Sequence, residues 1–467
     1  MFRFTHQATR HACALLCLGL AGCAGFSPDG GFGPVQQAAK DRLGQDVRWA
    51  RTDDDRQALQ QRTGELLASP LTADSAVQIA LLNHRGLQAG FQQLGIAEAE
   101  LVAASRLPNP GFSMGRLRRG DEREIERGLS FDLGHLITLP LRRPLEQRRF
   151  EAVQRQVAMS VFTLAADARK AFYQAVAAEQ AVRYQQDVAA AAEASAELAH
   201  RMAAAGNWSA LQQAREQAFQ ADAALAVARA RGEQTRARER LVRLMGLSSA
   251  SFTLPDRLPD LPTAPAPQAD IEQRAIDQRL DVQAARLQAE ATAKNLGLSR
   301  VTRFVNVLEF GAQRNTSNDA PPQTGYEISL ELPLFDWSGA RVVQAEALYR
   351  QSLDRAAQAG IDARSQVRET WAAMAAAHEV ARRYRDEIVP ANQRISEQNL
   401  LRYNGMLIGV FELLADARAQ IASVNAAIQA QRDYWLAQAD LDMALIGPPS
   451  VSPTGAATTV AAPAAGH

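Results

Sequence analysis

The chain has 467 residues, equal numbers of basic and acidic side chains (51 of each), and 47% hydrophobic but only 6% aromatic residues. A chain of this length can hold several domains or one extended assembly. Because phosphate binding needs a basic face, the balanced charge argues against nucleic acid as the main partner.

The first 22 residues have the layout of an export signal. Two arginines supply its positive end, and the apolar run 12–20 is too short to span a bilayer. Residues 20–23, Leu-Ala-Gly-Cys, resemble the lipobox of bacterial lipoproteins, which predicts cleavage before Cys23 and a covalent lipid on that residue. By the same resemblance, Ala24 favours sorting to the outer membrane. A cytosolic start with a chance match is the alternative.

Cleavage would leave Cys23 as the only cysteine of the mature chain. Because that thiol would be acylated, a disulfide and a thiolate metal site are excluded. No cofactor is therefore expected beyond the lipid on Cys23, and no metal site is expected.

Long Ala- and Gln-rich stretches dominate the rest of the chain and predict helices. No later apolar run reaches the roughly 18 residues that a membrane-spanning helix needs. Five prolines crowd into 247–269, which predicts an extended connector. The predicted helices are 73–106, 145–205, 209–246, 270–300, 341–404 and 410–446.

The connector divides the chain into two similar halves, which indicates an internal duplication. Ala80 matches Ala275 at an offset of 195, and Leu-Pro-Leu at 139–141 matches Leu-Pro-Leu at 332–334 at an offset of 193. The order of elements also repeats: helix, two strands, long helix, glycine turn, shorter helix. The predicted segments are a signal peptide 1–22, an N-terminal segment 23–72, repeats 73–246 and 270–446 around the linker 247–269, and a disordered tail 447–467.

Four short strands are predicted, at 111–119, 129–139, 301–312 and 326–332. Apolar residues such as Leu129, Phe131, Ile328 and Leu330 alternate with polar ones, so that each strand has one apolar face. An ordinary sandwich shows the same alternation, but two strand pairs cannot build a useful core of that kind. Open strand edges are also forbidden in lipid, and four strands are fewer than the roughly eight of the smallest membrane barrel.

If the strands lie in lipid, several chains must therefore close one barrel. The chain would cross outward after residue 110, turn through the charged segment 116–126, and return to Pro140. The second crossing would turn through 313–325 and return to Pro333. Pro140 and Pro333 are thus the predicted strand-to-helix exits.

At this point the sequence resembles the TolC-type outer-membrane efflux protein family. The resemblance rests on the lipoprotein start, the duplication, and the strings LTADSAVQIALLNHRGLQA, LPNPGFS, ISLELPLFDWSGAR and RYNGMLIGVFELLADARAQ. It implies a mainly α fold with a small membrane β part. Three chains would form one 12-stranded outer-membrane β-barrel, continued by a long α-helical barrel in the periplasm, where segment 23–72 would also lie.

The resemblance also implies a gate at the periplasmic tip. The tip turns would lie near Gly206 and Gly405, and the tyrosine and carboxylate of the family's gate fall on Tyr403 and Glu412. The family's second carboxylate falls on Ala415, with Asp416 beside it. For Glu412 the alternative is an exposed residue near a helix cap. Pro390 should bend the second long helix.

The predicted function is that of a passive outer-membrane channel in a tripartite efflux system. Its partners would be two further copies, a periplasmic adaptor, an inner-membrane pump of the RND type, and outer-membrane lipid. A periplasmic adaptor lipoprotein, a channel for type I protein secretion and a structural coiled-coil lipoprotein are the alternatives. Drugs, solvents, metal ions and proteins remain open as cargo, with heavy metals or copper favoured by overall resemblance. Scattered histidines and the lack of catalytic motifs argue against an enzyme.

Overall fold

A computed structural model describes residues 25–249, 251–265, 267–303, 307–331 and 338–449. The chain forms two compact units. The first contains the N-terminal segment to Val35 with 90–157 and 280–360, and the second contains 36–89, 158–279 and the chain from Ile361. Each unit therefore combines segments from both halves of the sequence. Cys23, Pro333 and most of the C-terminal tail lie outside the described residues.

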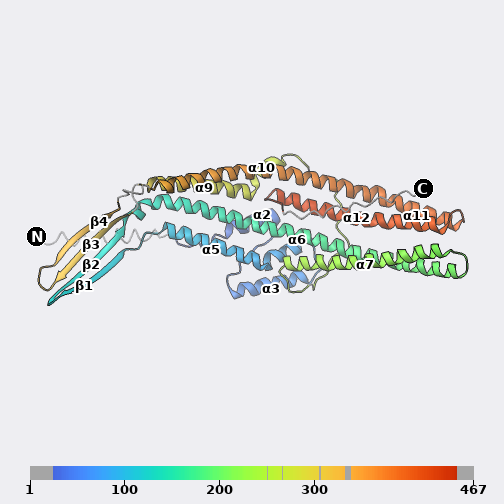
Figure 1. The fold of residues 1–467 in the computed structure, drawn as a ribbon, viewed down its shortest axis with the longest axis horizontal. Coiled ribbons are helices and arrows are strands. Elements are labelled where there is room, and N and C mark those ends of the chain that lie inside the picture. The colour runs from blue at the N-terminus through green and yellow to red at the C-terminus, as the bar shows by residue number, and fades with distance from the viewer. Residues whose placement is uncertain (1–24, 250, 266, 304–306, 332–337, 450–467) are drawn as a thin grey trace. The chain divides into compact units, whose positions relative to one another are not determined.

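One antiparallel sheet forms the β part of the first unit, with its strands in the order β1-β2-β3-β4 (Figure 1). The predicted strand at 111–119 is confirmed as β1, Gly111–Arg119. The predicted charged turn 116–126 was too long. β2 begins at Glu122, and Glu122 lies opposite Arg119, the last residue of β1. The strand predicted at 301–312 is displaced to β3, Leu308–Ser317, and the following turn is confined to 318–322 before β4, Gln323–Leu330.

The exit from the sheet corrects the sequence prediction. β2 ends at Asp132, and α6 (Leu133–Ala204) begins at the next residue, so the segment 133–139 is helical. Asp132 Oδ1 accepts a hydrogen bond from the backbone N–H of His135 at 2.8 Å, which caps the helix start. Pro140 therefore lies inside the helix, and its assignment as the exit was wrong.

Both repeats interrupt their first helix at the same place. The helix predicted at 73–106 is broken at His84 into α4 (Ala73–Asn83) and α5 (Arg85–Ser105). The helix predicted at 270–300 is broken at Arg279 into α8 (Ile271–Gln278) and α9 (Leu280–Val301). His84 and Arg279 are extended, and their N–H groups donate to the carbonyls of Ala80 and Ala275, each at 3.0 Å. The predicted offset of 195 holds at this break.

The remaining helices follow the predicted spans closely. Capping boxes start several of them, with Thr52, Thr72 and Ser209 each accepting a bond from the backbone three residues later. Segment 23–72 contains two helices that were not predicted. Those two are α2 (Gly33–Leu43) and α3 (Asp53–Leu67). The helices that follow the predicted spans are α7 (Ala210–Leu244), α10 (Gly339–Arg383), α11 (Val389–Asn404) and α12 (Val410–Ala444).

A short π-helix, η1 (Tyr384–Ile388), joins α10 to α11 directly before Pro390. The N–H of Val389 donates to the carbonyl of Tyr384, five residues earlier. Proline lacks an N–H and clashes with the carbonyl four residues before it, and the wider π turn accommodates both effects. A π segment thus precedes Pro390, and the bend predicted there stays a prediction. Just before it, hydrogen bonds from Arg382 and Arg383 lower the pKa of Glu379 to about 2.

The core of the second unit consists of aliphatic and aromatic side chains, most of them on facing helices. Phe172 and Tyr173 of α6 lie in one cluster with Leu241 of α7, and Tyr434 of α12 lies in another with Met374 of α10. Alanines fill ten of the 22 other buried positions of these two clusters, which allows the helices to approach closely. In the described part of the chain, no helix has a stretch long and apolar enough to cross a membrane.

Candidate functional site: the helical turns of the second unit

The first turn joins α6 to α7 and is closed by backbone hydrogen bonds. The N–H of Asn207 donates to the carbonyl of Met202 at 2.9 Å, and Gly206 between them has φ +77°. This bond pattern with a left-handed residue is a Schellman motif, which favours glycine. Ser209 then caps α7. Gly206 thus lies where the chain reverses its direction between α6 and α7.

The second turn joins α11 to α12 with the same pattern, shifted by one residue from the prediction. Leu407 N–H donates to the carbonyl of Arg402 at 2.9 Å, and the left-handed residue is Met406, with φ +57°. Gly405 is the preceding C-cap residue and has φ −82°. The turn therefore matches Gly206 with Met406 rather than with Gly405. The two turns lie at the same end of the second unit (Figure 1).

The three predicted gate residues lie around this second turn. Tyr403 is half-buried in the last turn of α11, and Glu412 is exposed in the first turn of α12, where the helix dipole favours a negative charge. No side-chain hydrogen bond within the described residues joins these two. Asp416 accepts a hydrogen bond from Asn399, which connects α12 to α11. The structure thus gives Asp416 a local partner and leaves Glu412 facing solvent in the single chain.

A buried ionic contact that sequence reasoning missed lies about two helical turns from these loops. Glu216 of α7 is 1% exposed. Its Oε1 accepts a bond from Arg418 Nη2 of α12 at 2.9 Å, and its Oε2 accepts one from Ser195 Oγ of α6 at 2.9 Å. The Arg418 guanidinium also lies over the Phe219 ring, 4.4 Å from its centre. This contact joins the helical hairpin of the first repeat to that of the second.

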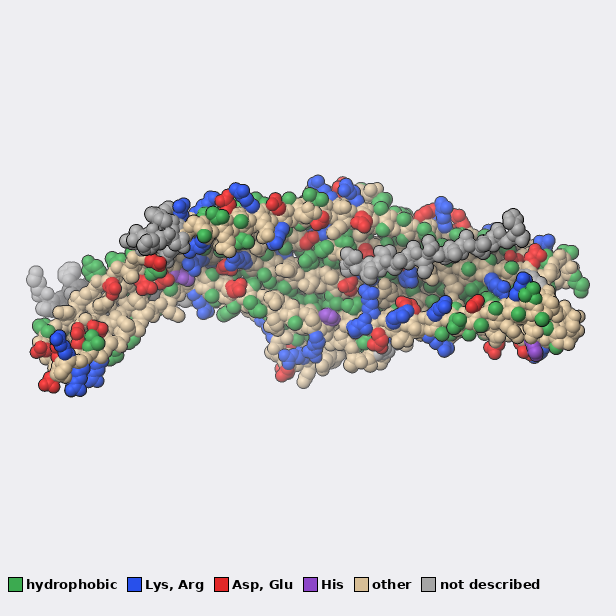
Figure 2. Space-filling model, in the orientation of Figure 1, with side chains coloured by type: hydrophobic (Ala, Val, Ile, Leu, Met, Phe, Trp, Pro, Cys, Tyr) green, Lys and Arg blue, Asp and Glu red, His purple; other side chains and the backbone are tan. Residues whose placement is uncertain are grey.

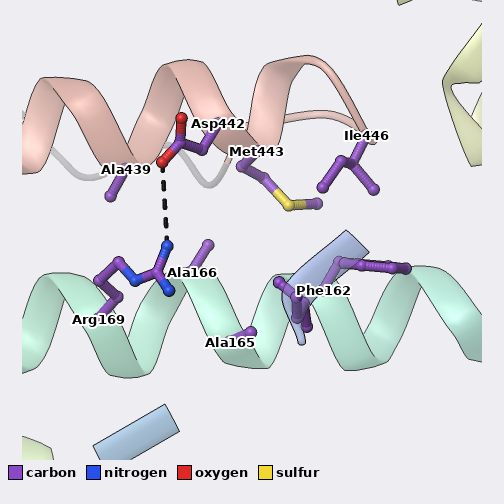
Figure 3. Close-up of a pocket in the computed structure, with 9 residues that line it drawn as sticks. Phe162, Ala165, Ala166, Arg169, Ala439, Asp442, Met443 and Ile446 are labelled. Carbon is purple, nitrogen blue, oxygen red and sulfur yellow. Dashed lines mark ion pairs between the residues drawn. The ribbon is translucent and has the colours of Figure 1, made fainter. Parts of the chain in front are cut away.

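A small cavity lies between α6 and α12 in the same unit (Figure 3). Its volume is about 30 Å³, which is room for about one water molecule. Arg169 Nη1 lies 3.9 Å from Asp442 Oδ2 across it, and Arg169 also pairs with Asp74 at 2.9 Å. Burial raises the pKa of Asp442, while Gln438 and Arg169 oppose the rise. A cavity of this size cannot hold an organic substrate or cofactor.

Metal-ligating side chains do not gather anywhere in the described ranges. No group of three or more histidine, cysteine, aspartate and glutamate residues is placed there to hold an ion. What the described chain offers instead is a sheet, two helical hairpins and the turns that end them.

Comparison with known proteins agrees with this arrangement. No protein-family model matches the chain. The cobalt-zinc-cadmium resistance protein CzcC of Cupriavidus metallidurans is 26% identical over 279 residues, which are 58% of this chain and 64% of CzcC. The chain thus matches somewhat less than two thirds of the length of that relative.

Solved structures of channels share the fold over most of the chain. The structure of CusC, described in terms of transmembrane channel formation, has a TM-score of 0.68 at 16% identity and covers 80% of this chain and 92% of CusC. The outer-membrane channel MtrE of Neisseria gonorrhoeae has a TM-score of 0.67 at 20% identity, covering 80% and 88%. These findings confirm the resemblance to TolC-type outer-membrane channels that the sequence predicts.

Proposed function

We propose that this chain, which has the fold of the TolC-type channels, is the outer-membrane channel of a tripartite efflux system. The observation that carries the proposal is the combination of a four-stranded sheet with two helical hairpins in duplicated order, shared with channels over 80% of the chain. Substrate would pass through without chemical change, so that no catalytic group is needed. A periplasmic adaptor and an inner-membrane pump of the RND type would complete the system.

The sheet supports assembly as a trimer. Its order leaves β1 and β4 as edges, each with one side unpaired in the single chain. Such edges cannot face lipid, because their N–H and C=O groups would have no partner there. Pairing β1 of one copy with β4 of the next would close a barrel of twelve strands from three copies. The helices of three copies would then surround a common passage in the periplasm.

The rival lipoprotein functions fit the structure less well. A periplasmic adaptor would place one helical hairpin in β-rich domains, whereas the described residues of this chain form two hairpins and one sheet. A coiled-coil lipoprotein would have sustained heptads and no need of a sheet. Heavy-metal cargo agrees with the name of CzcC, a cobalt-zinc-cadmium resistance protein, and stays a prediction.

Glu412 and Tyr403 are proposed to narrow the passage at the second turn, with Asp416 held beside them by Asn399. In a trimer, three exposed Glu412 carboxylates would attract cations and repel anions. Glu412→Gln should therefore lower the cation-to-anion permeability ratio, by about twofold or more. The ratio is measured from the reversal potential of the purified protein in a planar bilayer under a salt gradient. The exposed Glu397→Gln, on the preceding helix, serves as the matched control; equal shifts in both variants would remove Glu412 from the gate.

Cys23 is proposed to carry the lipid that anchors the mature chain in the outer membrane. Cells fed a labelled fatty acid should label the wild-type protein and leave Cys23→Ala unlabelled, because no other cysteine would remain in the processed chain. Cys17→Ala, inside the signal, should label normally. Label retained on Cys23→Ala would refute the assignment.

A further inference from the structure

One face of the sheet is apolar next to the helices. Strand register places residues side by side in rows, and alternate residues share a face. One row holds Phe131, Phe310 and Ile328, and the next holds Phe112, Leu129, Ala312 and Tyr326. Their large side chains are exposed, Phe112 and Tyr326 to 70% and 77%. This face would contact lipid in the proposed channel.

Arginines continue the same face toward the hairpin turns. The next rows carry Met114 with Arg127 and Arg314, then Arg116 with Ile125, and finally Arg118 with Arg123. All five arginines are exposed, and no ion pair within the described residues involves any of them. Arg118 Nε donates only to the carbonyl of Gly120, at 3.0 Å. Figure 2 shows charged side chains gathered at this free end of the strands.

The carboxylates of these strands lie on the other face. Glu122, Glu124 and Glu126 alternate with the arginines of β2, so they point away from them, and Glu327 of β4 shares their face. The apolar face carries five arginines and no carboxylate in its described strands.

Two of the arginine contacts are unfavourable in the isolated chain. Arg118 lies directly opposite Arg123, and Arg127 lies directly opposite Arg314. Like charges at facing strand positions destabilise a sheet. A bound anion between the two guanidinium groups would reverse that effect, because arginine forms paired hydrogen bonds with phosphate.

We propose that this arginine face binds the phosphate groups of the outer-leaflet glycolipid, lipopolysaccharide. The inference rests on the proposed outer-membrane location, which places the hairpin turns outside and the helices in the periplasm. Along this face, from the helices toward the hairpin turns, apolar rows come first and arginines follow. A lipid molecule has the same order, with its acyl chains followed by its phosphates. Basic side chains beside an apolar surface attract anionic lipid headgroups in this way.

The test measures binding of lipid A to the full-length protein purified from outer membranes in a neutral detergent. The variants Arg118→Gln/Arg123→Gln and Arg127→Gln/Arg314→Gln each remove one facing pair. Each should weaken binding by at least about tenfold, since two basic contacts are lost. Arg119→Gln, at the same end but on the opposite face, should bind within about twofold of wild type. Lipid A stripped of its phosphates should bind wild type no better than it binds the variants.

A readout other than binding separates this role from a structural one. Without anionic lipid, both double variants should melt at or above the wild-type temperature, because the facing repulsion is relieved. Equal binding by wild type and both double variants, or equal binding of the stripped lipid, would overturn the proposal. Full displacement by inorganic phosphate would also overturn it, in favour of a simple phosphate site. Failure of the channel proposal itself would instead appear as wild-type protein absent from the outer-membrane fraction.

Discussion

Arg279→Ala should lower the free energy of unfolding of the second unit by about 3 kcal/mol or more, which is a large effect for one side chain. Arg279 is fully buried at the break between α8 and α9. Its Nη1 donates to the carbonyl of Ala444 at the end of α12 at 3.3 Å, and its Nη2 donates to Gln366 Oε1 of α10 at 2.9 Å. The alanine would leave these acceptors without their donor and open a cavity.

The first repeat offers a matched comparison. Asn83, beside the equivalent break, donates from Nδ2 to the carbonyls of Met245 and Gly246 at the end of α7, at 3.2 and 2.6 Å. Asn83→Ala should cost less, about 1–2 kcal/mol, because a half-buried neutral amide is lost. The exposed Arg274→Ala on α8 should change stability by no more than about 0.5 kcal/mol. The melting temperatures of the three variants, measured by circular dichroism during thermal unfolding, rank their losses of stability. Equal melting of Arg279→Ala and Arg274→Ala would show that the break does not depend on Arg279.

Arg418→Met should lower the free energy of local unfolding of the helices next to the turns by about 2–4 kcal/mol. Removing one partner of a buried ion pair leaves the other charge without compensation, which usually costs about 3–5 kcal/mol, and the expected cost is lower here because Arg418 is 39% exposed. Among the described residues, Glu216 would then keep Ser195 as its side-chain partner. Amide hydrogen exchange of α7 and α12 around these residues should quicken by at least about 30-fold, since 1.4 kcal/mol corresponds to a factor of ten.

Two further variants decide what the contact contributes. Glu216→Gln in the Arg418→Met background removes the unpaired charge and should restore part of the protection. Arg201→Met breaks an exposed pair with Glu197 on α6 near the same turn and should cost under about 0.5 kcal/mol. If exchange in Arg418→Met matched that in Arg201→Met, the buried contact would have no role in holding the two hairpins together.

The sequence predicted the long helices well because alanine, glutamine and arginine favour helix and because glycine or proline marks several of their ends. It could not show the breaks at His84 and Arg279, because neither residue is a glycine or proline and the break depends on tertiary contacts. The end of β2 was misplaced for a different reason. Apolar alternation continues through Ile137, but the cap that Asp132 provides favours a helix from Leu133 onward.

The sequence predicted where the candidate site lies, but not the conformation of its second turn or the contacts between its helices. Family resemblance and the glycines located both turns, while the strained position of the second turn, Met406, carries no sequence signal that distinguishes it from a helical residue. The Glu216–Arg418 contact joins residues 202 positions apart in similar helices, so that only the folded chain pairs them. The arginine face likewise depends on strand register, because its members lie on three strands.

Single-channel recording tests the central claim most directly. Mature wild-type protein purified from outer membranes and inserted into a planar bilayer should give stepwise conductance with a preference for cations. The contradicting result is a folded, inserted oligomer that never conducts, even when Glu412→Gln and Tyr403→Phe are combined to relax the proposed constriction.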